Sequence, residues 1–121
     1  MLIAGLAVAG ALGALARYLV DAVVIRRSRG GLPAATLAIN ISGSFVLGVL
    51  TGLVLYHGLS TTSKTILGTG FCGAYTTFST FTYEVVHLFE AREHRAAALT
   101  LALSVVAPAL VAGIGLALAS R

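Results

Sequence analysis

Charged residues are sparse in this chain and fall in clusters, which leaves four long apolar segments between them. The segments cover residues 2–25, 33–56, 65–89 and 96–120. A helix needs about 20 residues to cross a bilayer, so each segment is long enough, and the short connections permit little more than helical hairpins. We therefore predict an all-α integral membrane protein in which residues 1–121 form a single domain of four transmembrane helices.

The composition supports this prediction and excludes several functions. Only 10% of the residues are charged, whereas a soluble domain carries about 25%. The net charge of +4 comes from basic residues that flank the apolar segments, as they usually do in membrane proteins, so we expect no nucleic-acid binding. A single cysteine excludes an internal disulfide. We find no nucleophile–base pair, no paired carboxylates and no phosphate-binding loop, and therefore do not expect an enzyme.

The third segment contains a polar run in its middle. Residues 76–82 read Thr-Thr-Phe-Ser-Thr-Phe-Thr, and five hydroxyl groups at that depth are costly in hydrocarbon unless something binds them. Three glycines between positions 68 and 73 weaken the preceding helix. Phe78 and Phe81 share a helix face, and their ring edges carry partial positive charge. We predict a break in this helix, because broken membrane helices occur where freed backbone groups are buried or bind ions.

The polar residues elsewhere in the segments each have two interpretations. Arg17 and Asp21 are four residues apart and can pair, so Arg17 is either neutralised near a helix end or part of an anion-attracting vestibule. Asn40 either joins two helices or donates to a passing anion. Glu84 is an interfacial end charge or faces a pathway. Ser104 bonds its own backbone or lines that pathway.

The positive charges also predict an orientation. Four spans place both termini and the connection 57–64 on one side, which carries Lys64 and Arg121. The other side carries five arginines: Arg26, Arg27, Arg29, Arg92 and Arg95. This excess favours cytoplasmic connections at 26–31 and 90–95.

Three motifs follow one another along the first three segments. They read Gly10-Ala-Leu-Gly-Ala-Leu-Ala-Arg17-Tyr18, Thr36-Leu-Ala-Ile-Asn40-Ile-Ser-Gly43-Ser-Phe45 and Gly70-Phe-Cys-Gly-Ala-Tyr-Thr76-Thr-Phe78-Ser-Thr-Phe81. With these motifs and four-helix spacing, the chain resembles the Fluc/CrcB fluoride channels over essentially its whole length.

The resemblance implies an antiparallel, dual-topology dimer with two fluoride pores and a structural sodium ion at its centre. It assigns the sodium to the backbone carbonyls of Gly73 and Thr76. Arg17 and Thr36 match structural or vestibule positions. The positions that match the fluoride pathway are Asn40, Phe78, Phe81, Thr77, Ser79, Thr80, Ser104 and Glu84.

Two features depart from the family pattern. Pro108 stands where a further polar position of the fourth helix is expected. The arginine excess fits one fixed orientation better than dual insertion, and this permits a heterodimer with an inverted homologue.

The resemblance therefore implies a fluoride-specific, passive channel in a prokaryotic inner membrane, crossed several times by the chain, that exports cytoplasmic fluoride. One alternative is a proton-coupled exporter of the small multidrug resistance type, which also has four short helices. Against it, the first segment lacks the membrane glutamate of that family, and the chain has no tryptophan. A structural membrane subunit without transport activity is a third interpretation.

Overall fold

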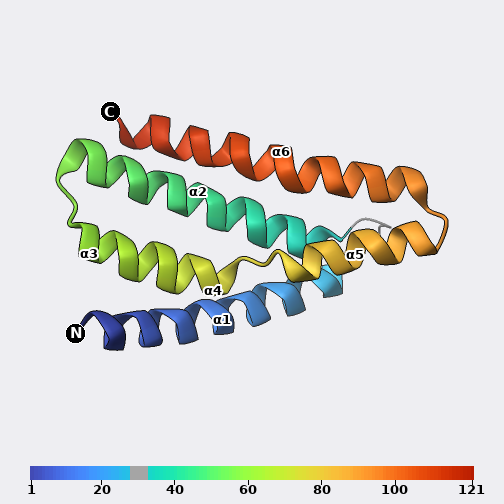
Figure 1. The fold of residues 1–121 in the computed structure, drawn as a ribbon, viewed down its shortest axis with the longest axis horizontal. Coiled ribbons are helices and arrows are strands. Elements are labelled where there is room, and N and C mark those ends of the chain that lie inside the picture. Colours follow the sequence, from blue (N-terminus) through green and yellow to red (C-terminus); the bar gives the residue numbers. More distant parts are fainter. Residues whose placement is uncertain (28–32) are drawn as a thin grey trace.

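The computed structural model describes residues 1–27 and 33–121 as an all-helical molecule (Figure 1). The helices are α1 (Leu2–Arg27), α2 (Ala34–His57), α3 (Thr61–Lys64), the π-helix η1 (Thr65–Cys72), α4 (Gly73–Tyr75), α5 (Ser79–Glu90) and α6 (His94–Ala119). The predicted set of four helices with a break in the third is confirmed, because α3, η1, α4 and α5 together form the third rod. Arg29, which the orientation argument uses, lies outside the described residues.

Three helices are long and apolar enough to cross a membrane: Leu2–Val24, Ala34–His57 and His94–Ala119. The third rod differs because residues 76–78 leave the helix, and neither part alone has the roughly 20 residues that a span needs. In Figure 1 the rods lie side by side, with both termini and the α2–α3 connection at one end. The break lies near the middle of the bundle's length, so it is placed at membrane depth.

Close contacts between small residues hold the rods together. A Cβ atom at Gly48 of α2 would overlap the backbone of Ala112 in α6. A Cβ atom at Gly13 of α1 would overlap the Phe71 carbonyl in η1. In lipid, helices associate by such close packing and not by the hydrophobic effect. The small-residue positions therefore fix α6 on α2 and α1 on η1, and the break is held between these two pairs.

The outward faces of the bundle are apolar. Leu12 of α1, Leu55 of α2 and Ile114 of α6 are among the large side chains with more than half of their surface exposed. The described residues bury few large side chains, of which Ile39 and Phe81 are two. Exposed apolar surface on this scale is expected where a chain meets lipid or another membrane chain.

Candidate functional site

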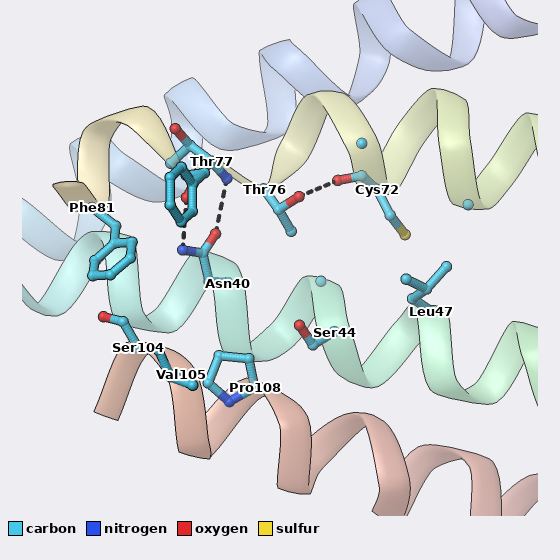
Figure 2. A pocket seen from close by; sticks show the side chains of 14 residues that line it. Asn40, Ser44, Leu47, Cys72, Thr76, Thr77, Phe81, Ser104, Val105 and Pro108 are labelled. Carbon is cyan, nitrogen blue, oxygen red and sulfur yellow. Dashed lines mark hydrogen bonds between the residues drawn. The ribbon is translucent and has the colours of Figure 1, made fainter. Parts of the chain in front are cut away.

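Asn40 of α2 bonds to the backbone at the point where the third rod breaks. Its Oδ1 accepts from the Thr77 N–H at 2.9 Å, and its Nδ2 donates to the Thr77 carbonyl at 2.9 Å (Figure 2). These two bonds take the place of the backbone hydrogen bonds that the Thr77 N–H and the Thr77 carbonyl would make in a continuous helix. A second Nδ2 hydrogen remains, and no hydrogen bond among the described residues uses it.

The start of α5 is organised by Thr77. Its Oγ1 accepts from the Thr80 N–H at 3.2 Å and lies 3.2 Å from the Thr80 Oγ1. Hydroxyl side chains commonly satisfy the free N–H groups at a helix start in this way. The N-terminal end of α5, which carries partial positive charge, therefore lies directly at the break.

The same bonds free two carbonyls that the sequence singles out. In a continuous helix, the Thr77 N–H would donate to the Gly73 carbonyl, and the Thr80 N–H would donate to the Thr76 carbonyl. Here those donors go to Asn40 and to the Thr77 hydroxyl. The Gly73 and Thr76 carbonyls thus lose their helical partners. Carbonyl oxygens are the ligands that hard cations accept, so this chemistry fits the sodium ion that the resemblance implies.

A groove of about 330 Å³ runs along α2, the break and α6. Figure 2 shows Asn40 and Ser44 projecting from α2, Ser104 and Pro108 from α6, and Phe81 beside them. Its wall combines apolar side chains, hydroxyl groups and the Asn40 amide, and none of the described residues that line it is charged. Its lining residues are Asn40, Gly43, Ser44, Leu47, Gly68, Cys72, Gly73, Thr76, Thr77, Phe78, Phe81, Ser104, Val105 and Pro108.

Two phenylalanines meet edge to face at one end of this groove. The ring centroids of Phe78 and Phe81 are 5.4 Å apart, and the ring planes make an angle of 78°. Phe81 is buried, with 5% of its surface exposed, whereas Phe78 is 74% exposed. One ring therefore belongs to the core, and the other reaches beyond the surface of the single chain.

Beyond Phe81, three buried polar atoms have no hydrogen-bond partner among the described residues. Glu84 accepts a short hydrogen bond of 2.6 Å from the Thr36 hydroxyl through Oε1, but its Oε2 is unpaired. The hydroxyls of Thr100 and Ser104 are unpaired as well, and Thr100 is completely buried. Each unpaired buried polar group costs about 1–3 kcal/mol. Glu84 belongs to α5 and the two hydroxyls belong to α6, which packs against α5.

A second cavity of about 280 Å³ lies on the α1 side of the break. The charged side chains in its wall are Arg17 and Asp21, and the hydroxyl side chains include Thr36 and Thr80. Thr77 lines both this cavity and the groove. Thr77, the residue that Asn40 binds, is therefore a wall that the two cavities share.

The structure brings most of the predicted site residues together and leaves two, Ser79 and Glu84, outside the walls of both cavities. Asn40, the two phenylalanines, Thr76, Thr77, Gly73 and Ser104 line the groove, and Arg17, Thr36 and Thr80 line the second cavity. Ser79 is exposed and lines neither. The Glu84 carboxylate is linked to the second cavity by its hydrogen bond with Thr36.

Sequence reasoning missed two features. One is the complete burial of Thr100, which the spacing of residues in the fourth segment does not reveal. Tyr75 lies against α2, where its hydroxyl is 2.9 Å from the Ser42 Oγ. Thirty-three positions separate that pair, and no local sequence signal identifies it.

Comparisons with known proteins agree over nearly the whole chain. The sequence model of one family, described as "CrcB-like protein, Camphor Resistance (CrcB)", matches residues 4–116. The "Fluoride-specific ion channel FluC 1" of Leifsonia xyli subsp. xyli is 51% identical over 100 residues, which are 83% of this chain and 73% of the relative. A protein of the same name from Symbiobacterium thermophilum is 48% identical over 113 residues, 92% of this chain and 91% of the relative. The "Fluoride-specific ion channel FluC" of Thermococcus onnurineus is 40% identical over 118 residues, 96% of this chain and 94% of the relative.

Proposed function

The chain belongs to the CrcB family of fluoride ion channels, and we propose that it is itself a passive, fluoride-specific channel that lets fluoride leave the cytoplasm. Relatives from bacteria and an archaeon carry the name of a fluoride-specific ion channel at 40–51% identity. With three helices long enough to cross a bilayer, the chain is a multi-pass membrane protein. The observation that carries the proposal is the uncharged groove at the break, which gathers an amide, hydroxyls and two phenyl rings.

The groove offers weak donors in place of water. Fluoride is small and strongly hydrated, and a channel must replace its water while still releasing it. The free Nδ2 hydrogen of Asn40, the Ser104 hydroxyl and the ring edges of Phe78 and Phe81 can each donate partial positive charge. Because no described residue of the groove wall carries a full positive charge, the ion would not be trapped.

The pathway continues, in this proposal, along the α5–α6 contact. Ser104, Thr100 and Glu84 each have a buried atom without a hydrogen-bond partner. Thr36 would hold the Glu84 carboxylate in place through the 2.6 Å hydrogen bond. Pro108 supplies no hydroxyl and lines the groove beside Ser104, so the track would follow Thr100 and not Pro108. Thr77 and Thr80 would lead toward the second cavity, and Ser79 would have no direct part.

A complete channel would contain two copies of the chain in antiparallel orientation, with two pores. The exposed Phe78 ring and the apolar outer faces support this, because a second copy would cover them. The freed carbonyls of Gly73 and Thr76 would hold a sodium ion between the copies. Bound there, the ion would supply fixed positive charge that balances the carbonyl dipoles. An inverted homologue could replace the second copy.

Fluoride efflux from liposomes that contain the purified protein tests the function. Fluoride-selective and chloride-selective electrodes would record the two ions in parallel experiments. We expect rapid fluoride release and no comparable chloride release. Equal release of both ions, or no release of either, would contradict the proposal. Proton-coupled uptake of a cationic dye would instead support an exporter of the small multidrug resistance type.

A further inference from the structure

Asp21 is a charged residue beside the proposed pathway to which neither the sequence motifs nor the groove assigns a role. It lines the second cavity together with Arg17, Thr36, Thr77 and Thr80. We propose that Asp21 sets how fast fluoride reaches the break, by offsetting the charge of Arg17 at the mouth of the pathway. This inference rests on the proposed channel function.

The position of the second cavity makes it an approach to the groove. Thr77 lines both cavities, and its backbone is the part of the break that Asn40 binds. Thr80, whose hydroxyl is 3.2 Å from that of Thr77, faces the second cavity. An anion that arrives at Thr77 from this side therefore passes the wall that carries Arg17 and Asp21.

The two charges act in opposite directions on that anion. Arg17 alone would raise the local concentration of anions, because a charge in a cleft with low-dielectric walls focuses the field. Asp21 lies one helical turn away on the same helix face and lines the same cavity. A further carboxylate, Glu84, binds Thr36 at the edge of this cavity. Asp21, with Glu84 nearby, would therefore offset the attraction that Arg17 alone would exert on fluoride.

Replacing Asp21 by a neutral residue should therefore raise the rate at which fluoride reaches the break and leave the later steps of conduction unchanged. We expect Asp21→Asn and Asp21→Ser to raise the initial rate of fluoride efflux about threefold at ionic strength near 0.01 M, where the Debye length is about 30 Å. The gain should fall below about 1.5-fold near 1 M, where the Debye length is about 3 Å. It should also vanish at saturating fluoride, because arrival then no longer limits the rate.

Two variants serve as controls. Asp21→Glu keeps the charge and should behave as the wild type. Glu93→Gln removes one negative charge from an exposed residue of the α5–α6 turn, at the end of the molecule where α1 also ends (Figure 1). Because Glu93 lies outside the second cavity, its neutralisation should leave efflux unchanged at every ionic strength.

The outcomes separate this inference from the proposed function. If the wild type releases no fluoride, the channel function itself fails, and that is seen before any variant is compared. If the wild type is active but both neutral variants match it or are slower, Asp21 does not control access. A gain that is the same at low and high salt, or that persists at saturating fluoride, would indicate a structural effect and would also overturn the inference.

Discussion

Asn40 binds the backbone at the break and, in the proposed channel, would also donate to the passing ion. Its oxygen and one amide hydrogen hold Thr77, and the other hydrogen remains for the groove. Asn40→Asp removes both amide hydrogens and places a negative charge against the Thr77 carbonyl. We expect fluoride efflux to fall by about 100-fold or more, because an unpaired carbonyl and a repelled anion each cost at least 1–3 kcal/mol. Fluoride-electrode recordings from reconstituted vesicles measure this.

The matched control for Asn40 is Thr51→Ala. Thr51 also lies on α2, but its hydroxyl bonds only the Leu47 carbonyl one turn back, and it lies outside the groove. This variant should keep wild-type efflux. If correctly assembled Asn40→Asp protein matched it, Asn40 would not lie on the ion pathway.

Phe81 and Phe89 allow a second comparison within α5. Phe81 is 5% exposed and meets the Phe78 ring edge to face, whereas Phe89 is 61% exposed and lies outside the groove. Phe81→Ile removes the positive ring edge but retains most of the apolar bulk. We expect efflux to fall at least tenfold. The lost aromatic contact alone is worth about 0.5–1.5 kcal/mol, and the changed shape of the groove adds to that loss. Phe89→Ile should have no effect, and equal rates in both variants would remove Phe81 from the pathway.

Among the helices, the third rod shows what the sequence can predict and what it cannot. Glycines followed by a hydroxyl run predicted a break, and the rod is broken. They did not predict an eight-residue π-helix before it, because π-helices are rare and their stability depends on the tertiary contacts around them. The break comes after the glycines, at the residues that bind Asn40 and start α5. Those partners are 37 positions away in the sequence, so local propensity alone could not identify them.

The contact between α2 and α6 makes a prediction about stability. Gly48→Ala would place a Cβ atom against the backbone of Ala112, whereas Gly113→Ala would meet nothing within 4 Å in the single chain. Overpacking costs about 1–3 kcal/mol, so Gly48→Ala should lower the thermal midpoint of the detergent-solubilised protein by several degrees. Gly113→Ala should leave it unchanged or raise it, because alanine favours the helix. A lower midpoint for Gly113→Ala alone would indicate that another chain packs at Gly113.

At the scale of the whole molecule, the single chain leaves one wall of the groove exposed. The Phe78 ring is 74% exposed, although it lines the same groove as the buried Phe81.

Composition and helix length predicted a four-helix membrane protein, because the bilayer constrains length and polarity strongly. They could not predict which outer face meets lipid and which meets protein, since both faces must be apolar. The proposed antiparallel dimer would close the groove, and its orientation can be measured.

Cysteine labelling from one side of the membrane tests this orientation. Thr62 is exposed in α3, at the end of the molecule that carries both termini, and Glu93 is exposed at the opposite end (Figure 1). In protein that carries Cys72→Ala, single Thr62→Cys and Glu93→Cys variants would be treated with a membrane-impermeant maleimide. If the chain inserts in both directions equally, as an antiparallel dimer of one chain requires, each variant should be labelled to about half of its total. If one variant is labelled fully and the other not at all, two copies of this chain cannot pair in antiparallel fashion. The groove would then have to be closed by an inverted homologue.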